Sequence, residues 1–437
     1  MEFEIGGRIQ IAALIELRSH FGGGVGEAHG DVVSLYPLEN IFKGGLALSQ
    51  FLKEGFNGCD AQKEASSKSD NTSPLSFCVI GGDCADVAVS LVAASASGCE
   101  LILCEREPEF VPPCAAVFST VIPKEPGEAR FVALEELRAR ILGALAVSTE
   151  LDPPIPEKEC KITFWSDGEQ KNETYRESEL YSIAVRYREA SELLPTDSVL
   201  STLSPSSKEG FFGGFLAPIL FSKRAVFTQD TASFLDSVRL IAPTKLITRP
   251  SVAKSVIQTM HERMGHPSRW QRGRGSHPVR AYLDRLFPRT AAARRRLRMT
   301  YIHYAFGGKL RSVITSGALE REESGELFRF GVLSGSFLSV ESCAIVGFRR
   351  WSDTDGIWRL ARGIGADMCS VGVGGIGTLT FFGSTAEDVL LNGHTECAGE
   401  LRLEFPEKTL LVSRLYGFPA KNRRFFAKNL NSLLQSN

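Results

Sequence analysis

Hydrophobic runs alternate with amphipathic segments along most of the chain. Residues 77–82, FCVIGG, predict a buried strand, residues 83–96 predict a helix of small side chains, and residues 99–105 predict a second strand. Further strands are predicted in residues 197–205, 223–228 and 244–251. Strands that alternate with helices indicate an α/β fold with mainly parallel sheets.

The pattern changes past residue 370. Residues 371–383, VGVGGIGTLTFFG, and residues 408–417, KTLLVSRLYG, read as short strands separated by glycines, which predicts a small β-rich unit. A chain of 437 residues is expected to form more than one core. We therefore predict an N-terminal α/β subdomain (1–160), a second α/β subdomain (161–340), the β-rich subdomain (341–425) and a residual tail (426–437).

Composition places the chain in the ordinary soluble class. It is 43% hydrophobic and 23% charged, and its 10 cysteines include no CxxC pair and no zinc-ligand spacing. No apolar run is long enough for a transmembrane segment, and the N-terminus lacks the apolar core of a secretory signal. We expect a reducing, cytoplasmic location, cytoskeletal assemblies included. A mitochondrial location is the alternative, although no presequence is evident.

Charge is balanced overall, with 50 basic and 51 acidic residues, but residues 267–300 are uneven. This predicted insertion holds ten arginines and a single acid, Asp284. Its densest part contains Arg294, Arg295, Arg296 and Arg298. We predict that these four bind an acidic surface of a protein partner. One alternative is that the segment binds nucleic acid. Another is that it is a solvated insertion without a partner.

Two glycine-rich segments imitate nucleotide-binding motifs. GVGGIG, residues 372–377, matches GxGxxG but is followed by a predicted strand instead of a helix, so it is interpreted as a turn. FCVIGGDCADVAV, residues 77–89, imitates the start of a dinucleotide-binding unit but lacks the third glycine. We interpret it as a βαβ building block without a ligand. Neither segment predicts a cofactor.

Several segments share the order and pattern of one known family, and they span roughly residues 30–425. They include residues 202–227, residues 236–257 and, as the most specific, FGGKLRSVITSGA at residues 306–318, which is similar to the family's "lGgrlRxixsGgAp". The likeness is to the adenylate-forming (AMP-binding) acyl-CoA synthetase superfamily, and the chain resembles its long-chain fatty acid–CoA ligases most. This resemblance implies the family's large domain, with two α/β subdomains and a small β-rich one. The family's C-terminal catalytic domain is expected to be absent.

The resemblance also implies where a nucleotide would bind. ITFWSDGEQKNETY, residues 162–175, occupies the slot of the ATP phosphate loop, "TSGTTGxPKG", and only Ser166 agrees. The family's glycines fall on Asp167, Gln170 and Thr174, and its lysine falls on Glu173. Such a loop would repel the phosphates and deny them close backbone contact.

Other positions of the family's nucleotide site also carry residues that differ from the family's. Phe337 keeps the aromatic residue of the "GYGxTE" slot and Glu341 keeps its magnesium carboxylate, but Leu338 and Val340 replace the glycine and threonine. Cys397 stands where the ribose-binding aspartate belongs, unless Glu396 shifts in by one residue, and Arg414 matches the hinge arginine. Ser166, Phe337, Glu341 and Arg414 are thus the remnants of a nucleotide site.

These departures predict a catalytically inactive pseudoenzyme with no catalytic residue, cofactor or metal. Its expected role is that of a structural or scaffold subunit in a larger intracellular assembly. One alternative is a divergent fatty acyl-CoA ligase that uses Lys171 or Lys309 in place of the missing lysine. Another is an acyl- or lipid-binding module that keeps an acyl tunnel without nucleotide chemistry.

Overall fold

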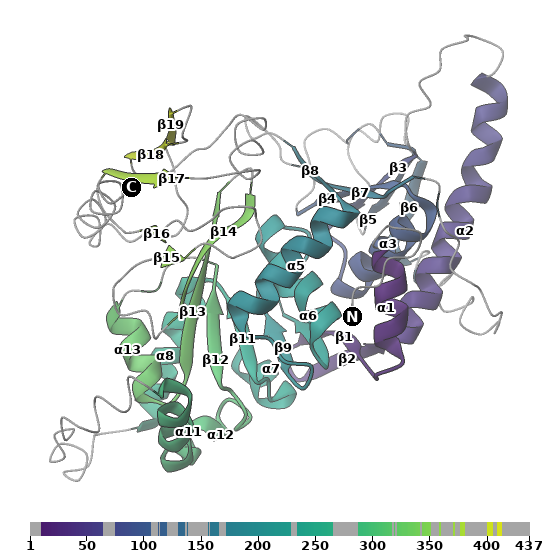
Figure 1. Ribbon diagram of the computed structural model, residues 1–437. Helices are drawn as coiled ribbons and strands as arrows, with labels where there is room; N and C mark the ends of the chain where they lie inside the picture. Colours follow the sequence, from purple (N-terminus) through teal and green to yellow (C-terminus); the bar gives the residue numbers. More distant parts are fainter. Residues whose placement is uncertain are drawn as a thin grey trace, which may run out of the picture. The chain divides into compact units, whose positions relative to one another are not determined.

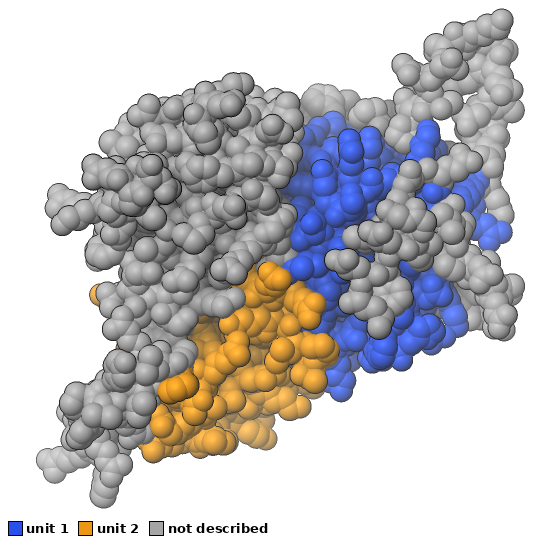
Figure 2. Space-filling model, in the orientation of Figure 1, with its two compact units in different colours: residues 1–28, 33–185, 204–227 blue, residues 29–32, 186–203, 228–437 orange. Residues whose placement is uncertain are grey.

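The structure is a computed structural model, and the numbers below give the part of the chain that it describes. These residues are 10–63, 75–105, 112, 114–119, 130–135, 138, 156, 158–165, 172–228, 234–264, 287–316, 319, 321–340, 343–350, 358–359, 370–371, 376–380, 400–404 and 409–412. The chain divides into two compact units, which are described separately (Figure 2). Unit 1 comprises residues 1–28, 33–185 and 204–227, and unit 2 comprises residues 29–32, 186–203 and 228–437. The boundaries predicted at residues 160, 340 and 425 stay predictions.

Unit 1 contains a six-stranded sheet in the order β6-β5-β3-β4-β7-β8 (Figure 1). All neighbours run parallel except β8, which is antiparallel to β7. The strands are β3 (Ser76–Ile80), β4 (Glu100–Cys104), β5 (Ala116–Ser119), β6 (Arg130–Ala133), β7 (Lys161–Trp165) and β8 (Glu173–Arg176). The central strands β3, β4 and β5 are continuous apolar runs and are buried almost throughout, as expected for parallel strands covered on both faces.

Three helices of unit 1 pack against one another (Figure 1). They are α1 (Ile11–Ser19), α2 (Leu38–Lys63) and α3 (Cys84–Ser97). The small side chains of α3 are nearly all buried, and α2 approaches α3 so closely that a Cβ on Gly45 would overlap Val92. The carboxylate of Glu177 holds α1 in place, because it accepts hydrogen bonds from the Ile11 backbone N–H (2.6 Å) and from the Ser95 hydroxyl.

Unit 1 also holds a parallel strand pair and a helix of unusual type. The pair is β1 (Gly24–His29) and β10 (Arg224–Phe227), and β2 (Val32–Pro37) follows β1. A π-helix, Gly210–Leu216, leads into α6 (Ala217–Phe221). Every residue of the π-helix is buried, and Gly210 lies so near the Ser204 carbonyl that no side chain fits there.

The sheet of unit 2 runs in the order β16-β15-β14-β13-β12-β11-β9 (Figure 1). The strands β9, β11, β12 and β13 are parallel, and β14, β15 and β16 continue the sheet in antiparallel fashion. Their bounds are β9 (Ser198–Ser201), β11 (Lys245–Thr248), β12 (Ser312–Thr315), β13 (Leu333–Val340), β14 (Cys343–Arg350), β15 (Trp358–Arg359) and β16 (Ser370–Val371).

Helices and a small sheet complete the described part of unit 2. The helices are α7 (Phe234–Ile241), α8 (Pro250–Met264), α11 (Pro288–Arg298), α12 (Thr300–Tyr304) and α13 (Arg321–Arg329), and α5 (Glu177–Ser191) begins in unit 1 and ends in unit 2. The small sheet has the order β17-β18-β19, with β17 (Ile376–Thr380), β18 (Glu400–Glu404) and β19 (Thr409–Val412). The two mainly parallel sheets confirm the predicted α/β class. Among the described residues, no helix combines the length and apolar character that a membrane span requires.

Candidate functional site

The slot of the phosphate loop lies between two antiparallel strands of unit 1. Residues 161–165 form the strand β7, and the helix α5 begins at Glu177. Between them the structure adds β8, which the sequence did not predict, with Phe164 opposite Glu173. Ser166 and the other residues up to 171 lie outside the described part of the chain.

Glu173, which stands where the family has its lysine, is a strand residue with its own partners. Its carboxylate oxygens accept hydrogen bonds from Lys208 Nζ at 2.8 and 2.9 Å and from the Tyr175 hydroxyl at 2.7 Å. The side chains of Glu173 and Lys208 are 21% and 17% exposed, so water screens this ion pair only in part. The ammonium group of Lys208 therefore has its partner, Glu173, within unit 1.

An aromatic cluster fills the space beside this ion pair. Phe164 and Tyr175 come from the strand pair, and Phe211 and Phe212 come from the π-helix. Neighbouring ring centroids lie 5.1 to 5.9 Å apart, mostly edge to face. Rings in this arrangement add to the stability that burial provides. The β7–β8 pair is thus packed firmly on the π-helix.

Of the other remnants of the nucleotide site, Phe337 lies in the described part of the chain. Phe337 lies in β13, just past Ser336, which is level with the last residue of β12. Its side chain is 6% exposed, and its ring contacts that of Tyr187 edge to face with centroids 4.5 Å apart. Glu341, Cys397, Arg414 and Lys171 lie outside the described residues, and Lys309 is exposed just before β12.

The four arginines predicted to bind a partner lie on α11 in unit 2. Arg294, Arg295 and Arg296 are half-buried, whereas Arg298 is exposed. The Arg295 guanidinium lies 4.3 Å from the centre of the Phe328 ring and donates to the Phe328 carbonyl at 3.2 Å. The structure therefore uses these arginines in different ways, and a partner contact through all four stays a prediction.

At the glycine turn after β3, charged side chains surround the start of α3. Asp83 and Asp86 form a capping box at the start of α3, and Arg138 donates to both carboxylates. Buried Glu27 adds a third carboxyl group, and burial, followed by the charge of Asp83, raises its pKa to about 8. Carboxyl groups thus occupy the helix N-terminus where a dinucleotide would place its phosphates.

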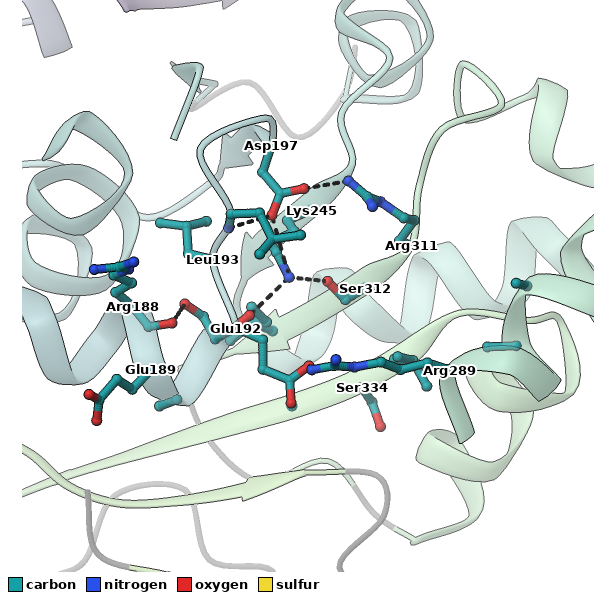
Figure 3. A pocket seen from close by; sticks show the side chains of 18 of the residues that line it. Arg188, Glu189, Glu192, Leu193, Asp197, Lys245, Arg289, Arg311, Ser312 and Ser334 are labelled. Atoms are coloured by element: carbon teal, nitrogen blue, oxygen red, sulfur yellow. Dashed lines mark hydrogen bonds and ion pairs between the residues drawn. The ribbon is translucent and has the colours of Figure 1, made fainter. Parts of the chain in front are cut away.

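Sequence reasoning missed a cavity of about 650 Å³ in unit 2 (Figure 3). It lies at the amino ends of β11, β12 and β13, where Lys245, Ser312 and Leu333 stand level with one another. The Arg-rich helix α11 contributes Arg289 and Arg296 to the lining. The residues that line the cavity are scattered over the sequence, so no local motif indicates them. The one sign of the cavity in the sequence is a polar residue at the first position of some buried strands.

Lys245 and Asp197 lie next to each other in the lining of this cavity (Figure 3). Lys245 Nζ donates to the Ser191 carbonyl at 2.9 Å and to Ser312 Oγ at 3.2 Å, and it lies 3.8 Å from Asp197 Oδ2. Asp197 Oδ1 also accepts a hydrogen bond from Arg311 Nη2 at 2.6 Å. Burial lowers the pKa of Lys245, and the charge of Asp197 opposes that shift.

Comparisons of the sequence with family models and with curated proteins give no match. The fold, in contrast, matches many solved structures. The inhibitor-bound N-terminal domain of FACL13 from Mycobacterium tuberculosis matches with a TM-score of 0.55 at 11% identity, over 84% of this chain and 85% of that one.

Two complexes with acyl adenylates are similar as well. The McyG A-PCP structure with phenylalanyl-adenylate has a TM-score of 0.54 at 9% identity and covers 84% of this chain and 64% of its own. The anthranilate CoA ligase AuaEII with anthranoyl-AMP has a TM-score of 0.51 at 9% identity and covers 78% and 61%. The chain therefore has the fold of the adenylate-forming enzymes, in the form seen in the N-terminal domain of FACL13.

Proposed function

We propose that this chain is a non-catalytic protein with the adenylate-forming fold and that it serves as a protein-binding subunit of a larger cytoplasmic assembly. The ion pair between Glu173 and Lys208 carries the first half of the proposal. The resemblance places a phosphate-binding lysine at position 173, and here a carboxylate occupies it. Because this carboxylate is paired with Lys208, the position offers a phosphate no cation of its own.

Phe337 supports the same half of the proposal. A side chain that stacks on adenine needs one accessible ring face. Phe337 is 6% exposed and already contacts Tyr187. Within unit 2 this ring behaves as a core residue.

Exposed side chains on α11 and α12 support a protein-binding role. Leu297, Tyr301 and Tyr304 are 78%, 56% and 67% exposed, and Arg298 lies beside Leu297. Tyrosine and arginine are enriched among the residues that dominate binding energy at protein interfaces. We call Leu297, Arg298, Tyr301 and Tyr304 the α11–α12 surface, and we propose that it contacts an acidic face of a partner protein.

The alternative is an enzyme that forms an acyl adenylate, which is the kind of ligand held by two of the similar structures. It would have to hold phosphate with another cation, such as Lys171 or Lys309. A lipid-binding module would differ from both, because it would bind a fatty acid without any response to ATP.

Calorimetry and a pyrophosphate assay test the proposal. We expect millimolar magnesium–ATP to leave the melting temperature unchanged, and we expect no pyrophosphate when a fatty acid is added. An active adenylate-forming enzyme, assayed in parallel, shows that both measurements work. A ligand present at 100 times its Kd adds about 2.7 kcal/mol to the free energy of unfolding, so binding would be visible. A saturable rise in melting temperature with ATP, or pyrophosphate release, would overturn the proposal.

A further inference from the structure

The cavity lies at the amino ends of parallel strands in unit 2. Ligands of open α/β sheets usually bind outside the carboxyl ends of the strands. Phe337 lies one residue past the partner of the last β12 residue, on the carboxyl side, whereas Leu333, which lines the cavity, begins β13. Four residues of a strand span about 13 Å. Within unit 2 the cavity is therefore separated from Phe337 along β13, and an inference about the cavity does not rest on the proposed function.

The lining of the cavity carries more positive than negative charge. It contains five basic side chains and three carboxylates, namely Arg188, Lys245, Arg289, Arg296 and Arg311 against Glu189, Glu192 and Asp197. Arg289 pairs with Glu192 at 2.5 Å, which leaves that pair neutral. Lys245 and Arg311 share Asp197. Two cations on one carboxylate leave an excess of positive charge around Asp197.

Arg296 adds to this excess. Within the part of the chain that the structure describes, no carboxylate pairs with Arg296, and the positive charge of Arg311 acts on it. Burial and this like charge both lower the pKa of Arg296. An anion between the two guanidinium groups would relieve their repulsion, and guanidinium groups bind carboxylate and phosphate oxygens in pairs.

Helical geometry explains how α11 delivers Arg296 to the cavity. Arg289, Ala292, Ala293 and Arg296 all line it, at the spacings that place residues on one face of a helix. The two alanines leave room, and Leu193, Ile314 and Leu333 add apolar surface. A volume of about 650 Å³ is within the range of small-molecule sites.

Some of the hydrogen bonds of Lys245 and Asp197 stabilise the fold and require no ligand. Lys245 donates to the Ser191 carbonyl, so it caps the last turn of α5, and Asp197 binds the backbone N–H of Leu194 at 2.9 Å. These contacts hold the turn after α5 in place and need no ligand. They do not explain Arg296, which makes no such contact among the described residues.

We propose that this cavity binds a small anionic molecule, with its phosphate or carboxylate group between Arg296 and Arg311 and an apolar part against the two alanines of α11. The probes are phenyl phosphate and benzoate, which share an aromatic body and differ in the anionic group. Benzyl alcohol is the neutral control, and inorganic phosphate is the control without an apolar part.

Titration calorimetry with the whole protein tests the site. We expect saturable binding of at least one of the two anionic probes, weakened by added salt, and at least tenfold weaker binding of benzyl alcohol and of inorganic phosphate. Arg296→Gln should weaken the bound probe about tenfold or more, because a charge-assisted hydrogen bond is lost. Arg298→Gln, the matched charge change on the exposed side of the same helix, should leave the affinity unchanged.

A second variant covers the case in which Arg296→Gln does not fold. Ala293→Met places a longer side chain at the cavity lining without changing charge, and it should also weaken the probe about tenfold or more. The proposal fails if neither probe binds the wild-type protein at millimolar concentration. It also fails if the neutral probe binds equally well, or if the folded cavity variants bind as tightly as the Arg298→Gln control.

Discussion

At the scale of single residues, the most unusual group is the buried carboxyl of Glu27. Its side chain faces Asp83, Asp86 and Arg138, and its pKa is raised to about 8, first by burial and then by the charge of Asp83. The carboxyl group is therefore protonated at neutral pH in the folded protein. In the unfolded chain it returns to the ordinary glutamate pKa near 4.3.

The difference between these pKa values predicts how stability depends on pH. Between roughly pH 4.3 and pH 8 the folded state holds a proton that the unfolded state has released, so the free energy of unfolding falls as the pH rises. The slope from this group is up to about 1.4 kcal/mol per pH unit. Glu27→Gln, which stays neutral, should flatten the curve.

Urea denaturation at several pH values from 5 to 9 measures this effect. Glu39→Gln is the matched control, because it makes the same substitution on the exposed first turn of α2. The explanation would be wrong if Glu27→Gln and the wild-type protein lost stability in parallel as the pH rises.

At the scale of helices and strands, close packing of α2 on α3 makes a sharp prediction. A Cβ on Gly45 of α2 would overlap Val92, so Gly45→Ala should lower the free energy of unfolding by about 1–3 kcal/mol. Gly325 of α13 has open space around its Cα, and there the same substitution should raise stability by up to about 1 kcal/mol. Chemical denaturation of both variants measures whether each substitution lowers or raises the free energy of unfolding. Stabilisation by Gly45→Ala would show that the two helices are not packed this closely.

The same scale shows what the sequence could predict. Long apolar runs such as β3 and the small residues of α3 were predicted because burial on both faces leaves a clear pattern. The strand β8 was missed because its four residues, ETYR, are mostly polar and take their strand form by pairing with β7. Local sequence does not contain that pairing.

The arginine run shows a different limit. Successive residues of a helix point about 100° apart, so three consecutive arginines are not expected to share one surface. The structure places Arg295 on Phe328, Arg296 at the cavity and Arg298 in solvent. The charge of the sequence identifies the arginine-rich segment. It does not identify the contacts of the arginines, because these are made with α13 and with strand ends distant in the sequence.

At the scale of the whole molecule, the proposed role requires a surface that remains available in the folded protein. The α11–α12 surface meets this requirement, since Leu297, Arg298, Tyr301 and Tyr304 are all exposed. Reversal of all four arginines of the run would disturb the contacts of Arg295 and the cavity. A test of partner binding therefore needs changes confined to the exposed side chains.

The last prediction uses such a variant, Arg298→Glu combined with Tyr301→Ala. An acidic partner should be repelled by the new glutamate and lose the tyrosine contact, so the variant should elute from a sizing column as a smaller species than the wild-type protein in native extracts. Arg263→Glu, on the exposed face of α8, is the matched charge reversal and should stay in the assembly. Melting temperatures of all three proteins should agree within a few degrees. If the double variant stays in the large species at native salt, the partner is bound by another surface of the chain.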